Sequence, residues 1–116
     1  QEKALKFYTE VLGFVMKRDI PMEEHRWLTV VPQEDQNGPE LVLEPMGFEP
    51  AKTYQKALYK AGIPFTAFHV DDIDNEYEKL KEKGVEFSME PKQMGPSKLA
   101  VFDDTCGNHI QLVEIL

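Results

Sequence analysis

The sequence contains a single cysteine, Cys106, so it can form neither an internal disulfide nor a zinc site built on several cysteines. It also lacks any run of eighteen apolar residues, which argues against a membrane-spanning helix. No signal peptide is visible at the start of the chain. These absences favour a globular protein of a reducing compartment, and we expect it in the cytoplasm.

Basic residues are scarce relative to acidic ones. The 13 lysines and arginines stand against 21 aspartates and glutamates, and the net charge is −8. The lysines are scattered along expected helices and do not gather beside aromatic residues, as they do in many nucleic-acid-binding surfaces. We therefore expect neither nucleic acid nor a membrane as a partner. The length of 116 residues fits one ordinary domain with one compact core.

Periodicity and punctuation residues predict an α+β order of elements. Gly13 and Gly84 each follow an amphipathic segment and are placed to end a helix, and the Asn37-Gly38 pair marks a loop. The resulting order is a helix, three strands, a connector helix, a strand, a helix and three strands. We expect helices over 1–12, 54–61 and 71–84, and strands over 14–20, 25–32, 40–45, 63–70, 85–91, 97–103 and 108–115.

Side-chain alternation divides four of these strands into an aliphatic face and a mixed face. Leu28 and Val30, or Ile110 and Leu112, represent the aliphatic face, which we expect to pack under the helices. The mixed face either meets water or lines a cavity, and its large apolar side chains favour the cavity. Glu114 lies on the opposite face of its strand from Gln111, so it is left out of the predicted cavity. The predicted ligand-binding residues are Trp27, Thr29, Val42, Phe65, Ala67, His69, His109, Gln111 and Val113.

Several segments resemble the vicinal oxygen chelate superfamily of glyoxalases, bleomycin-resistance proteins and extradiol dioxygenases. These segments are KALKFYTEVLGF, HRWLTV, ELVLEP, AFHVDDID and FDDTCGNHIQLVE. The resemblance covers the whole chain in order and implies one domain, 1–116, made of two βαβββ modules whose sheets curl around a shared cavity. The modules would span about 1–46 and 63–116, joined by a connector helix near 51–61, and the first strand of the first module is absent from this chain. It also implies a homodimer.

The resemblance also implies where a metal would bind. Metal-using relatives take one ligand from the first and one from the last strand of each module. Carried onto this sequence, the second position matches Glu44, the third falls on Phe65 and the fourth on Gln111, whereas the first would precede Gln1. Phenylalanine cannot coordinate a metal and a neutral amide compensates little charge. His69 and His109 lie nearby on the same faces, so a site for Zn, Ni, Mn or Fe made of Glu44, Gln111 and His69 stays open, although we expect no cofactor.

Three functions follow as hypotheses. The preferred one is a small-molecule-binding protein without a conventional metal, which holds an aromatic or amphipathic ligand by stacking and burial. The alternative is a glyoxalase I-like lyase or isomerase, in which a metal polarises the substrate and Glu44 moves a proton. An extradiol-type dioxygenase ranks last because it requires a His, His, Glu set for iron. Whether the protein is an enzyme is left open by the sequence. Cys106 lacks an identifiable base partner, so a turn or packing role is favoured over catalysis.

Overall fold

The computed structural model describes residues 1–45 and 47–116, which form two compact units, Gln1–Phe48 and Glu49–Leu116. Met46, at the expected end of the first module, lies outside the described residues. Each unit contains one β-sheet and at least one helix, which is the α+β class that the sequence predicts. No helix in the described ranges is both long and apolar enough to cross a membrane.

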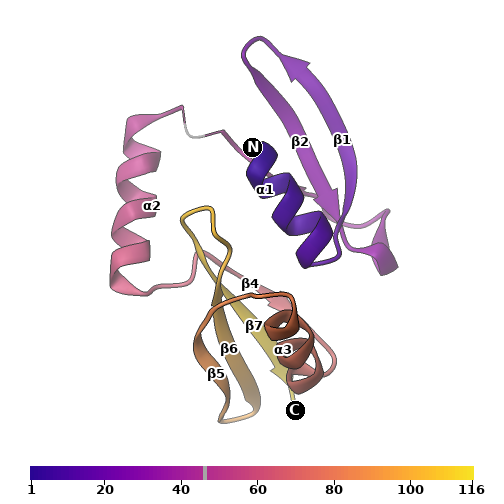
Figure 1. Cartoon of the computed structure of the whole chain (residues 1–116), viewed down its shortest axis with the longest axis vertical. Helices are drawn as coiled ribbons and strands as arrows, with labels where there is room; N and C mark the ends of the chain where they lie inside the picture. The colour runs from indigo at the N-terminus through magenta and orange to yellow at the C-terminus, as the bar shows by residue number, and fades with distance from the viewer. Residues whose placement is uncertain (46) are drawn as a thin grey trace. The chain divides into compact units, whose positions relative to one another are not determined.

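The first unit is a helix followed by a three-stranded antiparallel sheet (Figure 1). The helix begins as α1 (Glu2–Lys6), widens into the π-helical segment η1 (Phe7–Val11), and ends before Gly13, whose φ of 84° suits glycine. The strands pair in the order β1-β2-β3. They are β1 (Val15–Met22), β2 (His25–Val31) and β3 (Leu41–Val42), with the short 3-10 helix η2 (Gln33–Asp35) between the last two.

The second unit begins with α2 (Glu49–Ala61) and continues as strand, helix and three strands. Its sheet has the order β4-β7-β6-β5, in which β4 runs parallel to β7 and the other neighbours are antiparallel. The helix α3 (Ile73–Glu82) starts at Asp72, whose side chain accepts a hydrogen bond from the Asn75 amide. The strands are β4 (Thr66–His69), β5 (Phe87–Met94), β6 (Ser97–Asp103) and β7 (His109–Ile115).

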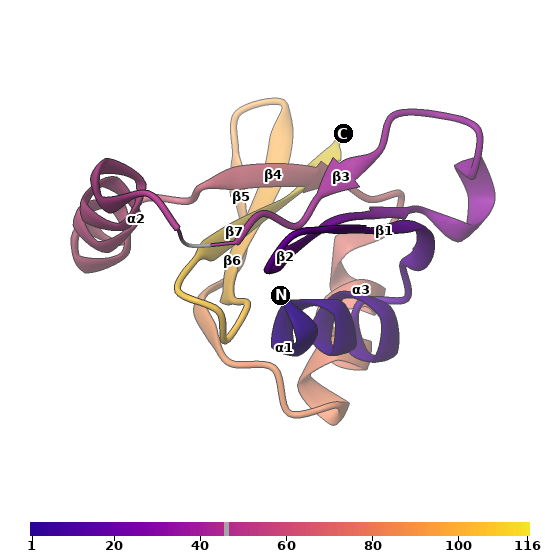
Figure 2. The ribbon, with the colours of Figure 1, turned by 90° about the horizontal axis from the view of Figure 1, so that it is seen from above.

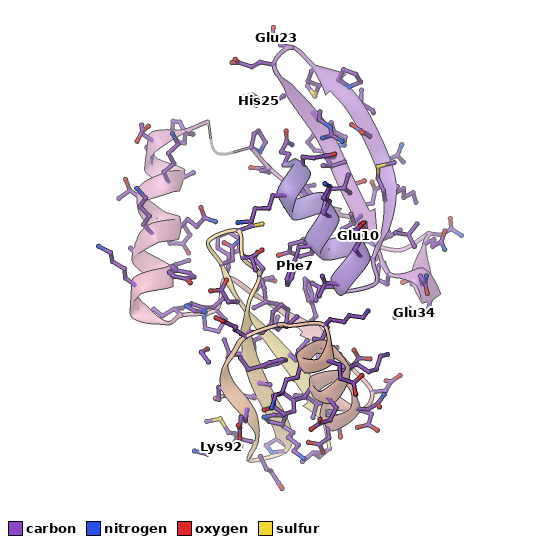
Figure 3. The ribbon with its side chains drawn as sticks, viewed as in Figure 1. Phe7, Glu10, Glu23, His25, Glu34 and Lys92 are labelled. Atoms are coloured by element: carbon purple, nitrogen blue, oxygen red, sulfur yellow. The ribbon has the colours of Figure 1, made fainter. Side chains whose placement is uncertain are left out.

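Two strands continue through prolines that the sequence analysis takes as turns or strand ends. The strand β1 runs past Pro21 to Met22, so that the turn lies at Glu23, which has a φ of 57° and sits at the tip of the hairpin (Figure 3). The strand β5 runs past Pro91 to Met94. Both are edge strands, where a residue without an amide N–H can face away from the neighbouring strand. The expected ends of these strands, at Ile20 and at Pro91, are therefore wrong.

The curled sheets implied by the resemblance are not observed. The two sheets are open, with β1 and β3 at the edges of one and β4 and β5 at the edges of the other. Three or four strands are too few to close a sheet on itself, and β3 contributes only two paired residues. Figure 2 shows α1 lying along one face of the three-stranded sheet, while the opposite face of that sheet is not covered by α1.

The aliphatic faces are buried, as the alternation predicts. In the first unit Leu28 and Val30 are fully buried, and Phe7 and Tyr8 of the helical segment are buried as well. In the second unit α3 covers the sheet. The buried side chains of this second core include Ile73, Leu80, Ala100, Phe102, Ile110 and Leu112, and Val101 and Val113 of the opposite face are buried as well.

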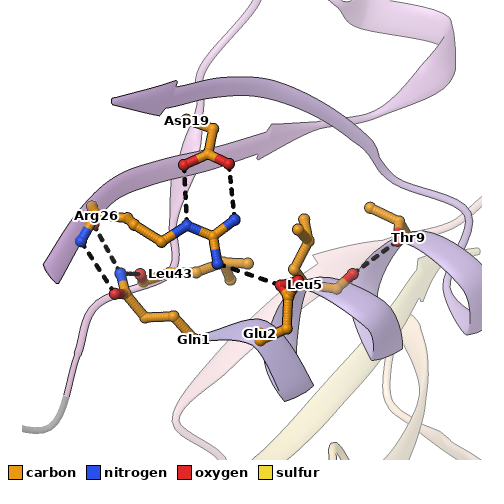
Figure 4. A network of polar contacts seen from close by, with 7 residues as sticks. All are labelled: Gln1, Glu2, Leu5, Thr9, Asp19, Arg26 and Leu43. Carbon is orange, nitrogen blue, oxygen red and sulfur yellow. Dashed lines mark hydrogen bonds and ion pairs between the residues drawn. The ribbon is translucent and has the colours of Figure 1, made fainter. Parts of the chain in front are cut away.

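Polar contacts attach α1 to its sheet (Figure 4). The Arg26 guanidinium donates to both carboxylate oxygens of Asp19, at 2.9 and 2.7 Å, and to Glu2 at 3.2 Å. The hydrogen bond from Arg26 lowers the pKa of Asp19. The Gln1 amide donates to the carbonyls of Arg26 and Leu43, at 2.7 and 2.8 Å. These contacts fix the start of the helix over the beginning of β2.

Candidate functional site

The four-stranded sheet has one face turned away from α3, which we call the open face. The pairing of β4, β7 and β6 places its side chains in rows: Ala67 beside Gln111, and His69 beside Val113. Four of the sequence-predicted residues therefore lie together on neighbouring strands. The open face consists of Phe65, Ala67, His69, Leu99, Val101, Asp103, His109, Gln111 and Val113.

The open face combines apolar surface with a few polar groups. Phe65 is 53% exposed, and its amide N–H donates to the His109 carbonyl at 2.8 Å, which holds it at the beginning of the face. Ala67 and His69 are exposed, and Gln111 is half-buried. Such a surface offers area for an apolar ligand, with an amide and an imidazole to orient it.

Tyr59 of α2 occupies one end of the open face. Its ring stacks on the imidazole of His109, with 4.4 Å between centroids and 8° between planes. Its hydroxyl donates a short hydrogen bond to Asp103 Oδ2, and its carbonyl oxygen accepts a bond of 3.2 Å from His109 Nε2. His109, which the sequence analysis expects to meet the ligand or the solvent, is thus engaged by the protein's own helix.

The same helix contacts the turn between β6 and β7. Gln55 donates from Nε2 to Asn108 Oδ1 at 2.8 Å and to the Cys106 carbonyl at 3.2 Å. Nearer the helix start, Tyr54 approaches Phe65 edge-on, with 6.3 Å between ring centroids. The helix α2 therefore meets the second unit's sheet through aromatic and amide side chains.

Asp104 organises that turn from the inside. Its side chain is fully buried and accepts hydrogen bonds from the amides of Cys106 (2.8 Å) and Asn108 (3.0 Å) and from Asn108 Nδ2 (2.8 Å). Cys106 takes part through its backbone, which agrees with the turn role favoured by the sequence. Glu114 lies on the other face, where it accepts a hydrogen bond from the Ile73 amide at the start of α3, so its exclusion from the mixed face is correct.

The hydrogen bond to Asp103 raises the pKa of Tyr59, because removing the phenolic proton breaks the bond and places a second negative charge beside the carboxylate. Asp103→Asn should therefore lower the pKa of Tyr59, measured by the ultraviolet absorbance of tyrosinate. Since the folded pKa exceeds the unfolded one, this contact stabilises the protein fully below the unfolded tyrosine pKa of about 10 and is lost as the pH rises through the folded pKa. An unchanged pKa would contradict the hydrogen bond.

The open side of the three-stranded sheet carries the other predicted residues. Trp27 is 43% exposed and pairs with Ile20 of β1, which is 50% exposed. Thr29 is buried, and its hydroxyl donates to Glu40 at 2.7 Å. This bond, more than the neighbouring Arg18, lowers the pKa of Glu40. The Thr29 hydroxyl is therefore already used within the protein, whereas Trp27 presents its ring to solvent. Val42 is half-buried beside Thr29 and Glu44 is exposed.

The described residues do not fit a divalent metal. No group of three His, Cys, Asp or Glu side chains that could hold an ion occurs in the ranges 1–45 and 47–116. On the open face, His69 and Gln111 lie diagonally on neighbouring strands, Phe65 stands at the third ligand position, and His109 is bonded to Tyr59. An imidazole and a neutral amide fall short of the donors that a catalytic zinc or iron site uses. We accordingly assign no chemical step to a metal.

Sequence reasoning missed Tyr59, Asp103 and Asp104. Alternation places Asp103 two residues after Val101 on the open face, so its position was readable from the strand SKLAVFD. Tyr59 lies on a helix whose docking depends on tertiary contacts that no local pattern encodes.

Comparison of this chain with known proteins identifies relatives. The sequence model of the Glyoxalase/Bleomycin resistance protein/Dioxygenase superfamily matches residues 1–112. The uncharacterized protein YurT of Bacillus subtilis (strain 168) is 55% identical over 98% of this chain and 90% of its own.

Two solved structures are also similar. The crystal structure of UcmS2 superposes with a TM-score of 0.82 and 34% identity, covering 98% of this chain and 89% of UcmS2. TnmS3, described as an antibiotic binding protein from Streptomyces sp. CB03234, superposes with a TM-score of 0.76 and 31% identity, covering 100% of this chain and 87% of TnmS3.

Proposed function

Because this chain belongs to the Glyoxalase/Bleomycin resistance protein/Dioxygenase superfamily, we propose that it binds a small aromatic or amphipathic molecule without the help of a metal ion. The observation that carries the proposal is the composition of the open face. Of the metal-ligand positions implied by the resemblance, the two on this face hold Phe65, which cannot coordinate a metal, and Gln111, a neutral amide. Membership of the superfamily alone does not fix a reaction.

Phe65 is the anchor that we assign to the ligand. A half-exposed aromatic ring at the beginning of the open face gains from stacking and from removal of its surface from water. Ala67, next but one along β4, leaves room above the sheet for a flat molecule. Val113 is buried and lies behind this surface, and His69 and Gln111 supply hydrogen bonds that orient the ligand.

In the first unit, Trp27 and Val42 provide a further apolar surface on the open side of the three-stranded sheet. An exposed indole is costly in water and well suited to stacking on a planar ligand. The description of TnmS3 as an antibiotic binding protein supports a ligand that is a small molecule rather than a macromolecule. A homodimer, implied by the resemblance, and a cytoplasmic location, expected from the composition, stay predictions.

Equilibrium dialysis with a planar aromatic probe, 2-methoxynaphthalene, tests the proposal. We expect binding that is unchanged by a chelator and about tenfold weaker in Phe65→Ala, because the ring contributes about 1–1.5 kcal/mol of stacking. Phe48→Ala is the matched control, since Phe48 is 69% exposed and lies in the first unit; it should bind like the wild type.

Three results would count against the proposal. They are the absence of measurable binding at about 1 mM probe, equal losses in the two variants, and binding that requires a stoichiometric metal. If binding requires a metal, and Glu44→Gln loses both the metal and the binding, the lyase or isomerase alternative would be favoured.

A further inference from the structure

One end of the open face already holds a phenol, supplied by the chain itself. Asp103 of β6 and His109 of β7 are direct partners in the sheet, so their side chains stand next to each other on the open face. Tyr59 lies on this pair with its ring parallel to the imidazole at 4.4 Å between centroids and its hydroxyl on the carboxylate. A flat surface beside a charged acceptor is the combination that recognises a hydroxylated aromatic ring.

The helix that delivers Tyr59 is held by few contacts. None of the thirteen residues of α2 is buried, and Tyr59 itself is 38% exposed. Tyr54 and Gln55 also attach this helix to the sheet and its turn. A helix of this length is marginal in isolation, and here it adds no buried apolar side chain to the core. Its withdrawal from the sheet therefore costs much less than the opening of α3, which buries Ile73 and Leu80.

The pair of Asp103 and His109 also has an unused atom. Because His109 Nε2 faces the Tyr59 carbonyl oxygen, it must carry a proton, and in the tautomer with this single proton the lone pair lies on Nδ1. This Nδ1 is buried and has no hydrogen-bond partner among the described residues. An unpaired buried polar atom is costly, so Tyr59 satisfies the pair only in part.

We propose that Asp103 and His109 form a phenol-binding site, which Tyr59 fills in this structure and which a hydroxylated planar aromatic ligand occupies when α2 withdraws. The inference rests on the proposed function and narrows its ligand class from aromatic molecules to those bearing a phenolic hydroxyl. Tyr59 acts as an internal competitor, which reduces the apparent affinity by the fraction of molecules whose site is open. A ligand with a second hydroxyl group can in addition donate to His109 Nδ1.

Removal of the competitor tests the inference. We expect Tyr59→Ala to bind 2-naphthol about tenfold more tightly than the wild type in equilibrium dialysis at neutral pH, whereas 2-methoxynaphthalene should gain less than about twofold because it cannot donate to Asp103. Adding Asp103→Asn should reduce the gain to about threefold, since the charge roughly doubles the strength of the hydrogen bond. Lys56→Ala is the matched control, since Lys56 is an exposed residue of the same helix, and it should produce no gain that depends on the hydroxyl.

The outcomes separate this inference from the proposed function. If the wild type binds 2-methoxynaphthalene but Tyr59→Ala gains nothing for 2-naphthol, or gains equally for both probes, the phenol site is wrong and the proposed function stands. If neither probe binds any folded variant, both are wrong. Should Tyr59→Ala fail to fold by circular dichroism, Tyr59→Phe keeps the ring on His109 and breaks only the bond to Asp103; it should gain about threefold for 2-naphthol alone, and an unchanged affinity would overturn the inference.

Discussion

Replacing Phe102 by alanine should lower the free energy of unfolding of the second unit by about 3–5 kcal/mol. Phe102 is fully buried on β6, directly opposite Ile110 of β7, and its ring lies 5.7 Å from that of Phe87. Truncation removes the apolar contact area and leaves a cavity that the surrounding strands and α3 cannot fill without distortion. Hydrogen exchange of the β6 and β7 amides measures the loss within this unit.

Phe65→Ala provides the matched control for Phe102→Ala. Both phenylalanines belong to the second unit, but Phe65 is 53% exposed and contacts the edge of Tyr54. Its truncation should cost less than about 1 kcal/mol, because little of its surface leaves water on folding. Equal losses in the two variants would mean that the assignment of the covered and open faces of the sheet is wrong.

Asp104→Ala should destabilise the second unit by about 2–4 kcal/mol. The carboxylate accepts three hydrogen bonds inside the turn between β6 and β7, and no water-accessible surface is left on the residue. Its removal leaves the donors of Cys106 and Asn108 without an acceptor, and it loosens a turn in which Thr105 holds a φ of 63°. Urea unfolding followed by circular dichroism measures the change.

The nearly isosteric variant Asp104→Asn isolates the role of the carboxylate. One side-chain oxygen can still accept from the amides of Cys106 and Asn108, but the new amide group faces Asn108 Nδ2, donor against donor. We expect a loss of about 1–2 kcal/mol, between the wild type and Asp104→Ala. A loss below about 0.5 kcal/mol in Asp104→Ala would show that water replaces the side chain and that the turn does not depend on it.

The faces of the sheets could be predicted because the alternation of a strand is a local property. Leu28 and Val30, and likewise Ile110 and Leu112, are buried as their positions indicate, and Glu114 turns to the helix side. Strand ends were harder to predict, since a proline ends a central strand but is tolerated at an edge, and the order of strands is not visible in the sequence. The extension of β1 past Pro21 and of β5 past Pro91 has this cause.

The candidate site was predictable where it depends on one strand and not where it depends on docking. The sequence brings Ala67, His69 and Gln111 to one face, as the structure has them. It gave no sign that α2 would lay Tyr59 on His109, because this contact joins residues fifty positions apart. The assignment of His109 to the ligand stays a prediction, to which the structure adds the contact with Tyr59. The argument from Phe65 and Gln111 against a conventional metal site does not depend on that contact.

The prolines in the outer strands bear on how the protein behaves at high concentration. An edge strand with free amides invites a strand of another molecule to pair with it, which starts aggregation. In β1 such pairing is hindered by Pro21 and by a shift of register next to Met16. In β5 it is hindered by Pro91 and by shifts of register next to Met89. The remaining edges, β3 and β4, are only two and four residues long. We expect molecules of this protein to resist fibril-like stacking even while they expose the aromatic side chains that ligand binding needs.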